Sequence, residues 1–170
     1  MLNKKIEKKI NEQINEELFS AYLYLAMGAY CEDINLPGFA NWMTVQFEEE
    51  QFHAMKFINY INERGGRVEL EALDKPQVEW EDMIDVFEAT LKHERHITSK
   101  INEIVDLAIE ERDHATVSFL NWYVDEQVEE EDTAEGILNQ LKMIDGKGNG
   151  MLMMDKEMAA RTFTAPAEEE

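Results

Sequence analysis

Residues 43–60 read MTVQFEEEQFHAMKFINY, a helical apolar pattern with charge at its centre. Residues seven apart lie on nearly the same face of a helix, because 3.6 residues make one turn. One such column contains Met43, Glu50 and Phe57, and Gln46 and His53 lie beside it. His53 follows Glu50 by about one turn and faces the same way. A glutamate therefore occupies a position where the pattern predicts core.

The same interruption recurs in three other helical stretches of the chain. An apolar column is broken near its midpoint by Glu17 in the first stretch, Glu94 in the third and Glu130 in the fourth. If helices of similar length pack side by side, these glutamates meet Glu50 at one level. Any one of them alone is more typical of a solvated face or of an ion pair. No Lys or Arg occupies these columns, so a buried ion pair lacks its cation.

Four buried carboxylates without counter-charge repel one another and take up protons unless cations neutralise them. Two divalent metal ions cancel four negative charges. One imidazole among mostly oxygen ligands suits Fe(II) or Mn(II), although zinc also binds such sites. The pattern therefore predicts a divalent metal centre and leaves the identity of the metal open.

The composition favours an all-α fold. Apolar residues recur at helical spacing, Pro occurs at only three positions, and no alternating strand pattern is present. A chain of 170 residues is long enough for one domain with a substantial core. We expect four long helices, over approximately 5–32, 39–64, 79–112 and 115–144.

The stretch 67–78 between the second and third helices lacks helical periodicity. Fully extended, such a stretch reaches roughly 40 Å, which is comparable with the length of a helix of about 28 residues. It is long enough to cross the whole bundle. We therefore predict an antiparallel four-helix bundle with a long crossover between helices 2 and 3 and a short fifth C-terminal helix.

Three regions are expected along the chain. Residues 1–145 form the four-helix bundle, 146–163 form a flexible glycine-rich joint and a short helix from Met151 to Arg161, and 164–170 form a disordered acidic tail. The methionine cluster 151–154 is interpreted as core-filling or as a subunit contact, with a soft metal site as the alternative.

The net charge of −21 argues against nucleic acid or an anionic membrane as a partner. No apolar run is long enough to cross a bilayer. The lone Cys31 has no partner for an internal disulfide, and the N-terminus lacks the apolar core of a signal peptide. These features predict a cytoplasmic protein.

Several motifs together resemble the non-haem ferritins of bacteria and archaea, and the resemblance covers nearly the whole chain. The motifs are Glu17, the Glu50-Gln51-Phe52-His53 sequence, Glu94, the run 126–130, and the stretches 22–25, 38–43, 63–68 and 121–124. The tail from Arg161 through Pro166 is most similar to archaeal members. The combination is highly specific, whereas a single Glu-x-x-His motif is weak.

The resemblance implies a centre for two iron ions in each subunit. The first iron is expected to bind Glu17, Glu50 and His53. Glu50 bridges to a second iron, which also binds Glu94. A further ligand of the second iron is Gln127 or Glu130, depending on the metal and its state. Tyr24 matches a tyrosine beside such centres that supplies a hydrogen bond or an electron, and its alternative role is that of an ordinary core aromatic.

A third iron site near this centre is also implied, with the ligands Glu49, Glu126, Glu129 and Glu130. In contrast to many di-iron oxygenases, the chain has only one Glu-x-x-His motif, because Ile97 and Thr133 follow Glu94 and Glu130 by three residues. The second site is therefore expected to be rich in oxygen ligands and to hold iron more loosely.

The activity implied by the resemblance is ferroxidation with iron storage and detoxification. Fe(II) is oxidised by dioxygen or hydrogen peroxide and kept as Fe(III) mineral inside a hollow homo-oligomeric shell, expected to have 24 subunits. Haem is not expected, because Gln51 and Phe52 stand where bacterioferritins place a methionine. A rubrerythrin needs more cysteines, and the ligand pattern of DNA-coating mini-ferritins is absent. A non-catalytic cation buffer and a purely structural bundle remain the alternatives.

Three histidines lie outside these motifs. His93 and His96 flank Glu94 but point elsewhere on the helix, and His114 lies at a turn between helices. A surface role is expected for each, and the alternative for His114 is a place in the lining of an iron entry pore.

Overall fold

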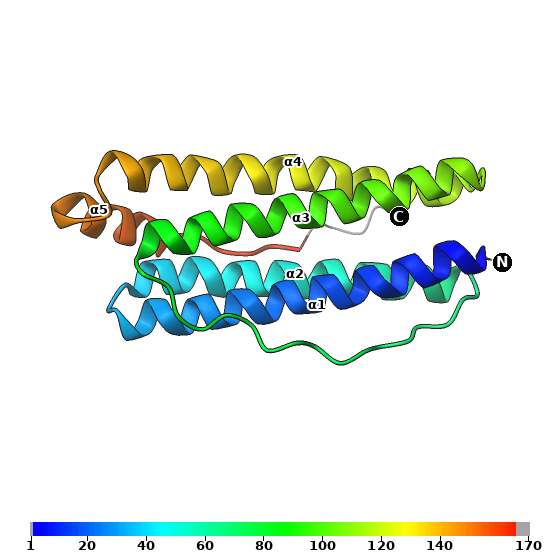
Figure 1. Ribbon diagram of the computed structural model, residues 1–170, viewed down its shortest axis with the longest axis horizontal. Helices are drawn as coiled ribbons and strands as arrows, with labels where there is room; N and C mark the ends of the chain where they lie inside the picture. Colours follow the sequence, from blue (N-terminus) through cyan, green and yellow to red (C-terminus); the bar gives the residue numbers. More distant parts are fainter. Residues whose placement is uncertain (1, 166–170) are drawn as a thin grey trace.

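The computed structural model describes residues 2–165, whose regular elements are five α-helices. They are α1 (Lys4–Asp33), α2 (Pro37–Glu63), α3 (Met83–Glu110), α4 (His114–Met143) and α5 (Gly148–Met158). Figure 1 shows α1 to α4 side by side along one axis, with α5 at one end of the bundle. α1 packs on α2 and α3 packs on α4, while α1 also contacts α3 and α5 contacts α2. The predicted all-α bundle with a short fifth helix is confirmed.

The connection between α2 and α3 runs the full length of the bundle beside α1, so that α2 and α3 point in the same direction (Figure 1). The side chain of Asn11 in α1 holds this connection through the carbonyl oxygen of Arg67 and the backbone N–H of Glu69, at 3.0 and 2.7 Å. The predicted crossover is therefore present. α3 begins at Met83, later than the predicted Glu79, and the crossover is correspondingly longer.

The late start of α3 has a local cause. The carboxylate of Asp82 accepts hydrogen bonds from the backbone N–H groups of Ile84 and Asp85, at 2.9 and 3.0 Å. A side chain that satisfies the free N–H groups of the first turn fixes where a helix begins. α2 ends at Glu63, close to the predicted Arg64. Gly65, which marks the predicted end in the sequence, has a φ of +69°. This left-handed residue ends the helix at low cost.

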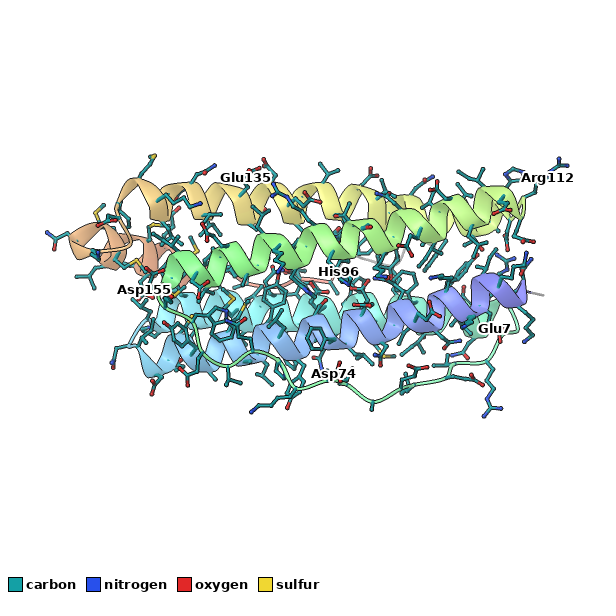
Figure 2. All side chains as sticks on the ribbon, in the orientation of Figure 1. Glu7, Asp74, His96, Arg112, Glu135 and Asp155 are labelled. Atoms are coloured by element: carbon teal, nitrogen blue, oxygen red, sulfur yellow. The ribbon has the colours of Figure 1, made fainter. Side chains whose placement is uncertain are left out.

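α5 begins at Gly148, earlier than the predicted Met151, so it includes the last residues of the glycine-rich stretch. The carboxylate oxygen Oδ1 of Asp155 in α5 accepts hydrogen bonds from the backbone N–H groups of Gly38 and Phe39, at 2.8 and 3.0 Å. Figure 2 shows Asp155 at the end of the bundle where α5 lies. α5 thereby caps the N-terminus of α2, which has no side-chain cap of its own.

After α5 the chain turns back along α2. The side-chain amide of Asn41 donates hydrogen bonds to the carbonyl oxygens of Met158 and Arg161, at 3.2 and 3.0 Å. The ring of Phe163 lies 5.9 Å from that of Phe52, further along α2. Of the tail predicted to be disordered, residues 166–170 lie outside the described residues.

The apolar core of the bundle is divided into two clusters. One lies toward α5, and its largest fully buried members are Tyr24, Met27, Phe39, Met43 and Phe87. The other lies toward the opposite end and includes Ile6, Ile10, Ile14, Phe57 and Tyr123. Along each of the four long helices, a buried glutamate separates the residues of one cluster from those of the other. Within residues 2–165, no helix is both long and apolar enough to span a membrane.

Gly38 provides a test of how α5 packs. A Cβ atom at this position would lie 1.6 Å from the carbonyl oxygen of Asp155, so Gly38→Ala forces α5 away from α2. We expect a loss of about 1–3 kcal/mol in the free energy of unfolding, the usual cost of overpacking. Thermal or denaturant unfolding followed by circular dichroism measures it.

Gly136→Ala is the matched control. Gly136 is an exposed residue of α4, and a Cβ atom there meets nothing within 4 Å. This substitution should stabilise the protein by about 0.5–1 kcal/mol, since alanine favours a helix over glycine. Equal stability of Gly38→Ala and the wild type would contradict the observed contact between α5 and α2.

Candidate metal centre

Each long helix contributes one buried glutamate to the middle of the bundle. Glu17 of α1, Glu50 of α2, Glu94 of α3 and Glu130 of α4 have exposed fractions of 1, 2, 1 and 7%. Glutamate is almost never buried to this extent unless it is paired. The structure thus places these four carboxylates inside the bundle, as the interrupted apolar columns predict.

Glu17, Glu50 and His53 lie closest together. One potential ligand atom from each falls within 4.8 Å of the other two. His53 Nδ1 is 3.4 Å from Glu50 Oε2 and 4.0 Å from Glu17 Oε2. Ligand atoms that share one ion at about 2.1 Å are at most about 4.2 Å apart. His53 can therefore share an ion with either carboxylate after little or no movement.

Aromatic side chains of α4 support His53. The hydroxyl of Tyr123 donates a hydrogen bond to the carbonyl oxygen of His53, at 2.8 Å. The imidazole packs against the rings of Trp122 and Tyr123, with centroid distances of 5.4 and 6.0 Å. These contacts fix the backbone and the ring of His53, so Nδ1 stays directed toward the carboxylates.

Glu94 is held by two donors. The hydroxyl of Tyr24 donates to Glu94 Oε1. The side-chain nitrogen of Gln127 donates to Glu94 Oε2 and to its carbonyl oxygen, both at 3.2 Å. The amide of Gln127 thus points its nitrogen at Glu94, which leaves its carbonyl oxygen as the atom that can bind a metal.

Two further glutamines contact the buried carboxylates. Gln13 Nε2 donates to Glu17 Oε1 at 2.8 Å, and Gln46 Nε2 donates to Glu130 Oε2 at 3.0 Å. Both amides are buried. Neither glutamine is part of the predicted site, although Gln13 precedes Glu17 by one helical turn and that spacing indicates a contact. These donors orient carboxylate oxygens, and they supply no charge.

Burial is the main influence on the acidity of this group. It raises the pKa of Glu17 and Glu50 well above the usual value, and the charges of neighbouring glutamates raise both further. Burial also raises the pKa of Glu94. Burial and the charge of Glu94 raise the pKa of Glu130 to about 8. Among residues 2–165, no Lys or Arg forms an ion pair with these four carboxylates, and the charge of Arg161 lowers the pKa of Glu130 only as a smaller influence. Protons or bound cations must therefore supply most of the counter-charge.

The residues predicted for a third site lie at the edge of this group. Glu49 and Glu126 are half-buried, whereas Glu129 is exposed. Burial raises the pKa of Glu49, and the charge of Glu126 raises it further. Glu49 Oε2 lies 2.6 Å from Arg161 Nη2. No local sequence pattern indicates this contact of Arg161, because it depends on how the chain returns along α2 after α5.

The remaining histidines were predicted to have surface roles. His96 and His114 are exposed, as predicted. His93 differs, because its Nε2 lies 2.7 Å from Oγ of the buried Ser20 and its ring packs on Phe19. Burial lowers the pKa of His93 to about 4, so this imidazole is neutral at physiological pH. Its position between α1 and α3 is that of a packing residue.

Comparison with known proteins agrees with this arrangement. Residues 7–144 match the ferritin-like domain family. The bacterial non-heme ferritins of Staphylococcus aureus (strain USA300) and Staphylococcus haemolyticus are each 40% identical over 163 residues, which cover 96% of this chain and 98% of each relative.

Solved structures agree as well. A novel open pore ferritin from the hyperthermophilic archaeon Archaeoglobus fulgidus matches with a TM-score of 0.94 and 45% identity, covering 95% of this chain and all of that one. A closed form of the same ferritin, engineered by site-directed mutagenesis, gives a TM-score of 0.95 and 46% identity over 96% of this chain. The chain therefore belongs to the ferritin-like family and is similar throughout to the non-haem ferritins of bacteria and archaea.

Proposed function

We propose that this ferritin is a ferroxidase that oxidises Fe(II) at the centre of its bundle and stores the product as mineral. The observation that supports it most strongly is the burial of four carboxylates from four helices without a Lys or Arg partner among the described residues. In this proposal iron is a substrate that binds, reacts and leaves. A purely structural bundle has no need for such a costly arrangement.

Two neighbouring sites are proposed. Glu17, Glu50 and His53 bind the first Fe(II), in line with the short distances between their ligand atoms. Glu50 bridges to the second, whose other ligands are Glu94 and the carbonyl oxygen of Gln127, or Glu130. Because His53, the only imidazole of the centre, belongs to the first site, the second site offers oxygen ligands. It therefore releases Fe(III) more readily than the first site does.

The reaction requires two electrons from two metal ions. Two Fe(II) ions and two protons convert one dioxygen to hydrogen peroxide, or one hydrogen peroxide to two waters. Two ions held next to each other meet the same oxidant together, so a one-electron radical product is avoided. The bundle contributes fixed ligands and a site from which water is largely excluded.

Tyr24 is proposed to position Glu94. Burial raises the pKa of Tyr24 well above its usual value, and the charge of Glu94 raises it further, so the hydroxyl remains a donor to that carboxylate. The same contact provides a route for an electron from the ring toward the second site. In either role Tyr24 acts through Glu94.

Storage requires an enclosed space. We propose that copies of this chain assemble into a hollow shell of 24 subunits in the cytoplasm, with a third iron site at Glu49, Glu126, Glu129 and Glu130 beside each centre. The similarity to bacterial non-heme ferritins and to the archaeal ferritin supports this assembly.

Substitution of the ligands tests the catalytic proposal. Glu50→Ala and His53→Ala should each slow the initial oxidation of Fe(II) by at least roughly tenfold, since even the outer partners of metal ligands have effects of that size. Stopped-flow absorbance together with oxygen uptake measures the rate after anaerobic protein and Fe(II) are mixed with oxygen.

Glu48→Ala is the matched control, because Glu48 is an exposed glutamate of the same helix. Its initial rate should equal that of the wild type. Wild-type rates in both ligand variants would rule out the proposed centre. Oxidation without retained mineral, seen when the same sample is sized, would indicate a di-iron oxidase instead of a storage protein.

The raised pKa values of the buried glutamates predict how pH affects the stability of the metal-free protein. Because their pKa values are raised, Glu17, Glu50, Glu94 and Glu130 keep their protons to higher pH in the folded state than in the unfolded chain, where the usual value is 4.5. The folded state therefore binds more protons, and stability falls as pH rises through the raised pKa values. We expect the midpoint temperature of thermal unfolding to decrease as the pH is raised from 6 to 9. Exposed carboxylates are already ionised over this range and do not contribute to the decrease.

Two comparisons test this explanation. Glu50→Gln should reduce the fall in the unfolding midpoint, whereas Glu48→Gln should not. Saturation with Zn(II) should also reduce the fall, because the metal replaces the protons as counter-charge. A midpoint of the metal-free wild type that is constant or rises over this range would contradict the proposed burial of uncompensated carboxyl groups.

A further inference from the structure

Arg161 lies at the edge of the proposed metal centre, although it belongs to the segment that follows α5. Its Nη2 is 2.6 Å from Glu49 Oε2, and both side chains are largely buried, with exposed fractions of 24 and 17%. The guanidinium also lies over the ring of Trp42, 4.5 Å from its centroid. A cation of the chain itself therefore occupies the acidic edge of the centre.

The charge of this guanidinium acts on two carboxyl groups of the proposed centre. The charge of Arg161 lowers the pKa of Glu49 and of Glu130, although burial raises both more strongly, so Arg161 is electrostatically close to both carboxyl groups. Gln46 is fully buried and donates to Glu130, while its Oε1 has no hydrogen-bond partner among the described residues. An unpartnered buried acceptor beside carboxylates indicates a place built for a cation.

The contact between Arg161 and Glu49 is incomplete. Only Nη2 reaches the carboxylate, and Nη1 is buried without a partner in the described part of the chain. Arginine holds a carboxylate most strongly through two parallel hydrogen bonds. A single contact of this kind can be displaced by a divalent ion.

The backbone does not have to move when the guanidinium leaves. Asn41 holds the carbonyl oxygens of Met158 and Arg161, and Asp155 holds the start of α2, independently of Glu49. The ring of Trp42 gives the guanidinium a surface to remain on, because a cation over an indole is itself stabilised.

We propose that Arg161 is a positioning residue that competes with the third metal ion for Glu49 and so sets how readily that site fills. The inference rests on the proposed function, from which the third site is taken. When iron is scarce the guanidinium neutralises Glu49. When iron accumulates, an ion displaces Arg161 and gains Glu49 as a ligand.

Titration with Zn(II), which undergoes no oxidation, tests the competition directly. The wild type is expected to bind two ions tightly and a third more weakly in isothermal titration calorimetry. Arg161→Gln, which removes the charge, should tighten the third step by about tenfold, the size of one partly buried charged contact. It should leave the first step unchanged, because that step is assigned to Glu17, Glu50 and His53 and the contacts of Arg161 are with Glu49 and Trp42. Arg161→Lys keeps the charge and should stay close to the wild type.

Lys156→Gln is the control for net charge, because Lys156 is an exposed cation of α5. It should alter none of the three steps. If Arg161→Gln leaves the third step unchanged, Arg161 does not compete, and if that step weakens, Arg161 supports Glu49 instead. Either result overturns the proposal, as does a Zn(II)-loaded crystal structure that holds a third ion at Glu49 while Arg161 Nη2 stays on the same carboxylate.

Failure of the proposed function gives a different result. If Glu50→Ala leaves the two tight steps intact, the central sites are wrong, whatever happens at the third step. A purely structural role for Arg161 predicts weaker binding in Arg161→Gln, and competition predicts tighter binding. The sign of the change therefore separates the two roles.

Discussion

The repulsion among four buried carboxylates is the constraint on which the centre of this bundle depends. Glu17, Glu50, Glu94 and Glu130 come from four different helices and lie where a bundle normally packs apolar side chains. Removing a carboxylate from water costs several kcal/mol unless its charge is neutralised. In the metal-free protein the pKa values of these groups are raised, and in the proposed function bound divalent ions supply the counter-charge instead.

The rest of the fold compensates for this polar layer. Apolar clusters pack on both sides of it, so each long helix is anchored at two ends while its middle carries the proposed ligands. Gln13, Gln46 and Tyr24 donate hydrogen bonds to individual carboxylate oxygens and fix their orientation. The side of the centre near Glu49 differs, because there a chain cation, Arg161, takes part. The proposed third site therefore differs from the two central ones, because a cation of the chain already pairs with one of its carboxylates.

Helical periodicity was sufficient to predict most of the fold. Four long amphipathic helices, with one long connection that lacks periodicity, can pack into only a few bundle topologies. The same periodicity located the buried glutamates. Helix starts were less predictable, since α3 begins where the side chain of Asp82 caps it and not where the apolar pattern begins. The contact of Arg161 with Glu49 joins residues 112 positions apart and depends on the path of the chain after α5, which no local pattern encodes. His93 was misjudged because its partner, Ser20, lies on another helix.

The central claim is that divalent ions take the place of counter-charge among the buried carboxylates. Crystals of the metal-free protein soaked anaerobically in Fe(II), with diffraction recorded at the iron absorption edge, test it most directly. We expect two anomalous maxima inside the bundle, one among Glu17, Glu50 and His53 and one between Glu50 and Glu94. Iron bound only at surface carboxylates, with no maximum between the four helices, would contradict it.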